Sequence, residues 1–178
     1  MKFYKRIMLA TDFSAVSELA ATKGAVFARE CEAELIFLHV VEHFPEHLTH
    51  YKIAHEEMDP QQFIVDRAGK DLDALAEKLG MPEATKEVRL TTRSAKAEIS
   101  KFASEEGVDL IVIGARGRNS LIDILSGSTA VGVVRAAPCD VFVIHEREPI
   151  LPMNFQDSHF FQDALAIRFA AGSFQRLF

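Results

Sequence analysis

Cysteine is scarce in this sequence of 178 residues, and no run of apolar residues approaches the ~18 that a membrane-spanning helix needs. The two cysteines, Cys31 and Cys139, form no C-x-x-C pair, so we expect small, buried or half-buried side chains rather than a redox or metal motif. The first residues, Met1 to Arg6, lead toward an apolar run without a cleavable signal pattern. We therefore expect no transmembrane segment and a cytoplasmic location.

An excess of basic residues is also missing. The chain has 20 Lys and Arg against 26 Asp and Glu, which gives a formal net charge of −6, and its basic residues form no long run. A protein that neutralises nucleic-acid phosphates needs a basic face, so the composition argues against a nucleic-acid partner. The length, with 48% hydrophobic residues, favours one globular domain with a full core.

Two common phosphate-binding motifs are absent, because the sequence contains neither G-x-x-x-x-G-K-[ST] nor a G-x-G-x-x-G after a strand. Instead, the apolar run 110–113 leads into Gly114-Ala115-Arg116-Gly117, and Gly127-Ser128-Thr129 follows nine residues later. Glycines let backbone amides approach an anion closely, and the first amides of a helix lack intrahelical partners. The pattern thus indicates a phosphate site, although a tight strand-to-helix connection would also need glycines.

Apolar runs alternate with segments of helical period along the chain. The runs that predict strands are 6–10, 33–41, 87–90, 109–113 and 140–144, and the segments that predict helices are 14–30, 61–79, 95–106 and 128–136. This order predicts an α/β protein with a parallel sheet and helices on both faces.

Helix boundaries agree with this reading. Ser14 and Ser94 are candidate amino-terminal caps, and Gly80 and Gly107 are placed to end the second and third helices. Such sheets bind ligands at the carboxyl ends of their strands, where the strand order reverses. The candidate site therefore comprises 11–14, 39–41 and the glycine loop.

With these residues in view, the chain resembles the universal stress protein family in its ATP-binding branch. The resemblance covers residues 3 to about 146 and depends on 10–14, Leu38-His39-Val40, 107–114, the complete G-x2-G-x9-G-S pattern and a closing strand at 138–144. It implies a single Rossmann-like, flavodoxin-like sheet of five parallel strands in the order 3-2-1-4-5.

The resemblance also implies a nucleotide site. Asp12 would lie by the nucleoside, Val40 would meet the adenine edge through its backbone, and Gly114 would lie against the ribose. The phosphates, with Mg²⁺ or Mn²⁺ between them, would contact the glycine loop. Arg93 departs from the family, because many ATP-binding members have a small residue there. The residues that the resemblance assigns to the nucleotide are Thr11, Asp12, Val40, Gly114, Arg116, Gly117, Gly127, Ser128 and Thr129.

Each assignment has a structural alternative. Asp12 can simply cap the following helix, His39 can be a hydrogen-bonded core histidine, and Arg116 and Arg118 can be solvated loop charges. At the level of function, the leading hypothesis is an ATP-dependent regulatory protein of the stress response. The alternative is a slow ATP hydrolase or a protein that phosphorylates itself, but no base or catalytic arginine arrangement is evident.

Three further expectations concern segments beside the main motifs. Histidines and carboxylates crowd 43–55, which fits a solvated lid better than a transition-metal site because Pro45 interrupts the segment. The domain would end near 148. The phenylalanine-rich extension 149–178, helical if Asp157 begins a helix, would pack on the domain or on a second subunit, with docking on a protein partner or a membrane surface as the less favoured alternative. The last strand would pair two chains into a homodimer.

Overall fold

The computed structural model describes residues 3–42, 60–115 and 128–145 of the chain. These ranges lie within one compact unit, Met1–Glu146. Strands and helices alternate in the order β1 (Arg6–Thr11), α1 (Ala15–Cys31), β2 (Glu34–Glu42), α2 (Pro60–Lys78), β3 (Thr85–Thr91), α3 (Ala95–Glu105), β4 (Leu110–Gly114), α4 (Ser128–Ala136) and β5 (Asp140–Ile144).

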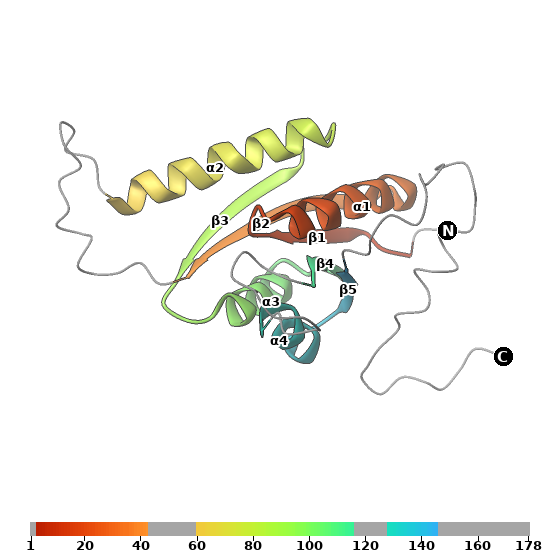
Figure 1. Ribbon diagram of the computed structural model, residues 1–178. Helices are drawn as coiled ribbons and strands as arrows, with labels where there is room; N and C mark the ends of the chain where they lie inside the picture. Colours follow the sequence, from red (N-terminus) through yellow and green to blue (C-terminus); the bar gives the residue numbers. More distant parts are fainter. Residues whose placement is uncertain (1–2, 43–59, 116–127, 146–178) are drawn as a thin grey trace. The chain divides into compact units, whose positions relative to one another are not determined.

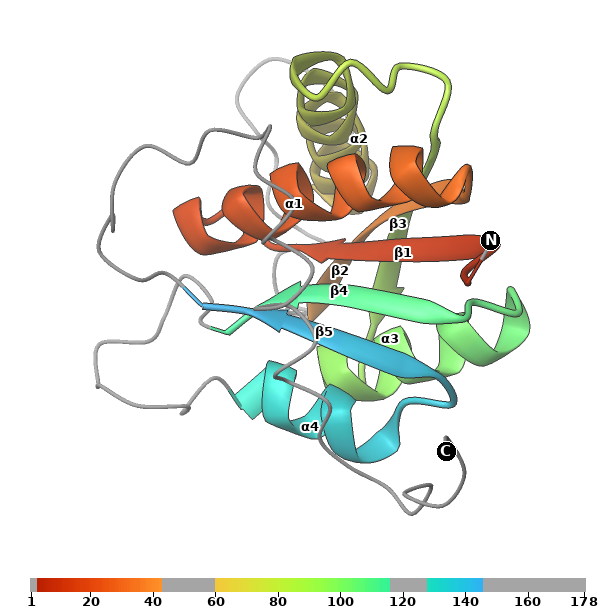
Figure 2. The ribbon, with the colours of Figure 1, turned by 90° about the vertical axis from the view of Figure 1, so that its right-hand side faces the viewer.

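The five strands form one sheet in the order β3-β2-β1-β4-β5, and every pair is parallel. This confirms the predicted fold class and strand order. Figure 1 shows the sheet between two groups of helices, and Figure 2 shows α1 and α2 on one side of it with α3 and α4 on the other. Right-handed crossovers between parallel strands require this division once the chain reverses its direction across the sheet.

Each face of the sheet carries its own hydrophobic cluster, because side chains alternate along a strand. In β1, Ile7 and Leu9 face the cluster with α1 and α2, whereas Met8 and Ala10 face the cluster with α3 and α4. All four are buried. A strand buried on both faces appears in sequence as a continuous apolar run, which is why β1 and β4 were recognisable.

Helix ends follow the predicted signals with one exception. Ser14 caps α1, since its Oγ accepts a hydrogen bond from Ser17 N at 3.3 Å. Gly80 and Gly107, which follow α2 and α3, have φ of +65° and +61°, a conformation that glycine adopts without steric cost. Ser94 occupies the N-cap position of α3, but its side chain makes no capping hydrogen bond.

Strand β3 is longer than its apolar run predicted, because its first residues, Thr85 and Lys86, pair with β2 although they carry polar side chains. At an edge strand the backbone hydrogen bonds to the neighbouring strand alone can hold such residues.

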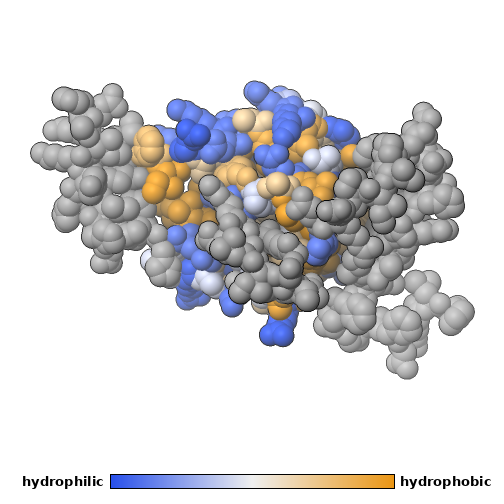
Figure 3. All heavy atoms as spheres, viewed as in Figure 1, coloured by the Kyte–Doolittle hydropathy of each residue, from blue (hydrophilic) through white to orange (hydrophobic). Residues whose placement is uncertain are grey.

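Hydrophobic side chains also reach the surface near the amino end of α2 in the view of Figure 3. Phe63 of α2 is 48% exposed, and Leu90 of β3 is 36% exposed.

Candidate functional site

The carboxyl ends of β1, β2 and β4 form one rim of the sheet. Thr11 at the end of β1 lies beside His39 of β2, and Ala10 lies beside Ile113 of β4. The chain leaves β1 toward one side of the sheet and returns to β4 on the other, so the strand order reverses here. The structure thus brings the predicted segments 11–14 and 39–41, and the described start of the glycine loop at 114–115, to the switch point, where doubly wound proteins hold their ligands.

The turn between β1 and α1 is held by its own side chains. Thr11 Oγ1 accepts from Phe13 N at 3.0 Å and lies 3.0 Å from Ser17 Oγ. Asp12 Oδ1 accepts from Ser14 N at 3.1 Å and from Ser14 Oγ at 2.6 Å. Phe13 has φ of +59°, which is uncommon for a residue with a Cβ. Side-chain hydrogen bonds therefore fix the conformation of this turn.

Asp12 occupies the predicted place at the rim, and it also fulfils part of its structural alternative. Its carboxylate orients Ser14, and Ser14 in turn caps α1. Asp12 thus does not cap the helix itself. It forms an Asx turn that orients Ser14, the residue that caps α1. Thr11 is 6% exposed, so its hydroxyl is buried where it holds the same turn.

Strand β2 is longer than β1 at this rim. The register of the two strands ends at Thr11 beside His39, whereas β2 continues through Val40, Val41 and Glu42 and pairs there with β3 only. Alternate residues of a parallel strand direct their N–H and C=O toward opposite neighbours. At least one residue of this extension therefore presents both groups to the side where β1 has ended. We call this feature the β2 notch.

Gly114 ends β4 against the start of α1. A Cβ at this position would lie 3.1 Å from Val16 Cγ1 and 3.2 Å from Ser17 N, closer than nine in ten real contacts. Helix-to-strand packing therefore favours a glycine here, a reason that the glycine-loop pattern did not reveal. The next amide is also engaged, because Ala115 N donates to Ile144 O at 2.7 Å.

Two residues that contribute to the rim were missed or undervalued in the sequence. Glu42 at the end of β2 accepts a hydrogen bond from Ala95 N with Oε1, and thereby replaces the expected Ser94 cap of α3. His39 Nδ1 lies 2.8 Å from Thr11 O, and its ring lies 4.6 Å from the Phe13 ring. His39 is thus bonded at the rim, as its structural alternative required in part, but it is only half-buried.

The phosphate side of the predicted site is described only from the start of α4. Ser128 is the first residue of α4, and Thr129 is half-buried in its first turn. Helix α4 packs closely on α3, because a Cβ on Gly132 would meet the Lys96 side chain at 2.3 Å. Arg116, Gly117 and Gly127 lie outside the described residues, as do the histidine-rich segment 43–55 and the extension 149–178.

Arg93, the departure from the family pattern, is exposed on the connection between β3 and α3. Its backbone N–H donates to Thr91 Oγ1 at 3.0 Å, which shapes the connection. The cation thus belongs to the segment that joins the end of β3, beside the β2 notch, to α3.

Metal and thiol chemistry find little support in the described ranges. Nowhere in 3–42, 60–115 or 128–145 do three His, Cys, Asp or Glu side chains gather in a way that could hold a metal ion. Burial, with a smaller contribution from the Asp140 charge, raises the pKa of the Cys139 thiol to about 11. Burial also raises the pKa of Cys31. Both thiols are therefore protonated near neutral pH and are poor nucleophiles.

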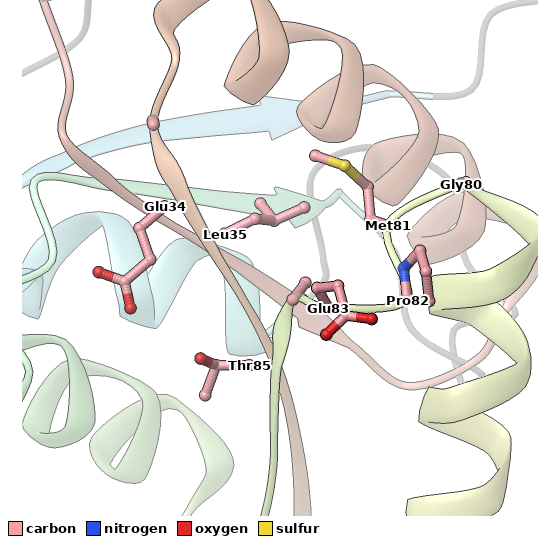
Figure 4. A pocket seen from close by; sticks show the side chains of 9 residues that line it. Glu34, Leu35, Gly80, Met81, Pro82, Glu83 and Thr85 are labelled. Atoms are coloured by element: carbon pink, nitrogen blue, oxygen red, sulfur yellow. The ribbon is translucent and has the colours of Figure 1, made fainter.

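A shallow pocket of about 410 Å³ lies at the amino ends of the strands, opposite the rim. It is lined by the start of β2 and by the turn from α2 to β3. Figure 4 shows Glu34 and Glu83 among its lining side chains. These carboxylates and the adjacent carboxyl end of α2 repel an anion. The carbonyls of Leu79 and Gly80 are bound by Arg29. This pocket is therefore a poor phosphate site, and the rim remains the candidate.

The sheet order and the rim define the class first: a doubly wound α/β protein whose ligand position is the switch point beside β1. Comparison with known proteins gives the family. The model of the universal stress protein family matches residues 3–145. The chain belongs to the universal stress protein family, as its sequence motifs predicted.

The similarity to known proteins extends over most of this chain and over nearly the full length of the relatives. A protein of Staphylococcus haemolyticus that carries the family's name is 32% identical over 158 residues, which is 88% of this chain and 92% of the relative. The structure of the universal stress protein UspA from Lactobacillus plantarum superposes with a TM-score of 0.63 at 28% identity and covers 79% of this chain and 97% of that one.

Two more distant structures share the fold at 20% identity. One is a universal stress protein in complex with cAMP, with a TM-score of 0.59, where the match covers 81% of this chain and 99% of that one. The other is a universal stress protein from Archaeoglobus fulgidus in complex with dAMP, with a TM-score of 0.53 and the same coverage. Within the described part of the present chain, none of the helices is both long enough and apolar enough to cross a membrane.

Proposed function

We propose that this protein binds ATP, with Mg²⁺ or Mn²⁺ on its phosphates, and acts as a nucleotide-dependent regulatory protein of the stress response. The observation that carries the proposal is the β2 notch, where Val40 to Glu42 continue past the end of β1. The adenine edge offers one hydrogen-bond donor and adjacent acceptors, so a strand edge with an N–H and a C=O matches it.

The phosphates would extend from the notch toward the amino end of α4. Helix α4 begins at Ser128, directly after Gly127, so its first amides lack intrahelical acceptors and carry the positive end of the helix dipole. Because the Ala115 amide is bonded within the sheet, the remaining donors would come from Arg116, Gly117 and the hydroxyls of Ser128 and Thr129.

A divalent cation would be held chiefly by the nucleotide. Mg²⁺ commonly keeps several waters and binds through one or two protein groups together with substrate phosphates. When bound, the ion would neutralise phosphate charge.

Binding is favoured over catalysis because the carboxylates of the described rim have structural roles in a turn and in a helix cap. Asp12 is bonded to Ser14, and Glu42 is bonded to the start of α3. A general base for an attacking water must lie within hydrogen-bond reach of that water beside the phosphates, and neither contact assigns such a role. At the level of the fold, the cAMP and dAMP complexes indicate that such sheets accommodate adenine nucleotides.

Calorimetric titration of the full chain with ATP and Mg²⁺ tests the proposal. We expect saturable binding, a higher melting temperature by mass action, and at least about tenfold weaker binding when Gly117→Val or Gly127→Val adds branched bulk beside the phosphate. Gly69→Ala is the matched control, because a Cβ at that site of α2 meets nothing within 4 Å.

Three outcomes would contradict the proposal in whole or in part. A wild-type protein with neither heat of binding nor a melting shift at ATP concentrations of about 1 mM would remove the nucleotide site. Unchanged affinity in both loop variants, folded as judged by their melting curves, would remove the glycine loop from it. Single-turnover release of phosphate from bound ATP would replace the regulatory assignment with the slow hydrolase alternative.

A further inference from the structure

We propose that His39 is a positioning residue for the nucleotide, because it ends β1 and holds the turn that borders the β2 notch. This inference rests on the proposed function, since it names a residue that shapes the same site. His39 lies at the rim beside Thr11, not in the middle of the sheet.

The first observation is the hydrogen bond between the two strand ends. His39 Nδ1 lies 2.8 Å from the carbonyl oxygen of Thr11. A carbonyl oxygen only accepts hydrogen bonds, so Nδ1 carries the proton and donates. This contact specifies the tautomer of the neutral ring, with hydrogen on Nδ1 and a lone pair on Nε2.

The second step concerns the end of β1. Inside a parallel sheet, a strand carbonyl accepts from an N–H of the neighbouring strand. At Thr11 the imidazole of His39 serves as a donor from the side chain, so the backbone can leave the sheet while its last carbonyl stays bonded. Strand β2 continues beyond this point through Val40 to Glu42. The β2 notch exists because β1 ends here.

The third observation concerns the backbone of Phe13. Its φ of +59° lies in the left-handed region, which is unfavourable for a residue with a Cβ and persists only where the surroundings hold it. Thr11 Oγ1 accepts from Phe13 N at 3.0 Å, and the His39 ring packs against the Phe13 ring with centroids 4.6 Å apart. His39 therefore contacts the turn at two points, one polar and one aromatic.

The consequence is a specific division of roles. Asp12 lies between the two residues that His39 contacts, so the placement of Asp12 at the rim depends on the imidazole. We infer that loss of the Nδ1–H donor lets the turn move toward β2 and narrow the notch. His39 would thus act through Thr11 and Phe13, without contacting the nucleotide itself.

Paired substitutions in the full chain separate the donor from the ring. His39→Asn keeps an N–H donor close to the position of Nδ1, whereas His39→Phe keeps an aromatic ring without a donor. In calorimetric titrations with ATP and Mg²⁺, we expect His39→Phe to weaken binding about tenfold, and His39→Asn to stay within about threefold of wild type. Melting curves without nucleotide check that both variants fold.

The outcomes distinguish this inference from the proposed function. If the wild type binds ATP and a folded His39→Phe binds equally well, the inference is wrong and the function stands. Equal weakening in both variants would assign the effect to packing and would also overturn it. If wild type binds no ATP, the proposed function itself fails.

A measurement on the wild type covers the case in which His39→Phe does not fold. Nitrogen-15 NMR of the imidazole should show the Nδ1–H tautomer, and its resonances should shift when ATP and Mg²⁺ are added. An Nε2–H tautomer, or resonances that do not move at saturating nucleotide, would contradict the inference.

Discussion

At the scale of single residues, Gly114 shows how one atom can constrain the rim. The missing Cβ would lie 3.1–3.2 Å from Val16 and from the Ser17 backbone nitrogen, in the first turn of α1. Backbone atoms cannot rotate out of the way as a flexible side chain can. The start of α1 and the end of β4 are therefore matched in shape at the switch point.

We predict that Gly114→Ala destabilises the protein by about 1–3 kcal/mol, because the added methyl group overpacks the contact with α1. Chemical denaturation of wild type and variant in urea measures this difference. The variant should also weaken nucleotide binding, since α1 would shift together with the turn that precedes it.

Gly69→Ala is the control for the same chemical change. It adds a Cβ inside α2 where no atom lies within 4 Å, so we expect a stabilisation of about 0.5–1 kcal/mol from helix propensity. A Gly114→Ala protein as stable as Gly69→Ala would show that α1 and β4 accommodate the methyl group, against our reading of the contact.

At the level of secondary-structure elements, the amino end of α3 is capped by a residue of a strand, Glu42 of β2. Glu42 ends β2 and accepts from Ala95 N at the start of α3, while the Ser94 side chain in the N-cap position makes no such bond. A carboxylate at this end also interacts favourably with the helix dipole. The contact ties α3 to the strand end that forms the β2 notch.

We predict that Glu42→Ala lowers the free energy of unfolding by about 1 kcal/mol, the usual cost of removing a helix cap. Ser94→Ala should change it by no more than about 0.5 kcal/mol, as expected for a surface substitution that removes no hydrogen bond. Urea denaturation of the two variants under one set of conditions gives the comparison. A larger loss in Ser94→Ala than in Glu42→Ala would show that Ser94 is the working cap.

At the scale of the whole molecule, the sheet ends in two edge strands, β3 and β5. The last four residues of β5, from Val141 to Ile144, are half-buried, and none of them is charged. Edge strands with apolar side chains are available for pairing with another chain. Strand β5 is therefore the edge that we expect to associate, as the family resemblance implied.

We predict that the full chain is a homodimer paired through β5. Val143→Lys should shift it toward monomer by placing a charge at that edge, and because Val143 also packs against the core cluster on the side of α3 and α4, a melting curve checks that the variant folds. Sedimentation velocity at about 50 μM is the measurement. Leu90→Lys is the control, because Leu90 is an exposed apolar residue on the other edge strand. A monomeric wild type, or equal dissociation in both variants, would count against β5 as the interface.

The fold class, the order of the elements and the family could all be predicted from the amino-acid sequence. These depend on information local to the chain: apolar runs for buried strands, periodic segments for helices, a cap such as Ser14, and motifs such as the glycine loop. The fold rule placed 11–14, 39–41 and the glycine loop at one rim, and the structure confirms this for 11–14, 39–41 and the start of the loop at 114–115. The roles of the nine predicted nucleotide residues remain predictions.

The roles of individual residues at that rim became visible only in the folded protein. His39 and Thr11 are 28 positions apart, and Glu42 and Ala95 are 53 apart, so no local pattern links either pair. Gly114 was noticed as a loop glycine, yet its tightest constraint comes from α1, which lies far earlier in the chain. Such contacts depend on strand register and on the packing of helix against sheet, and these arise only when distant segments meet.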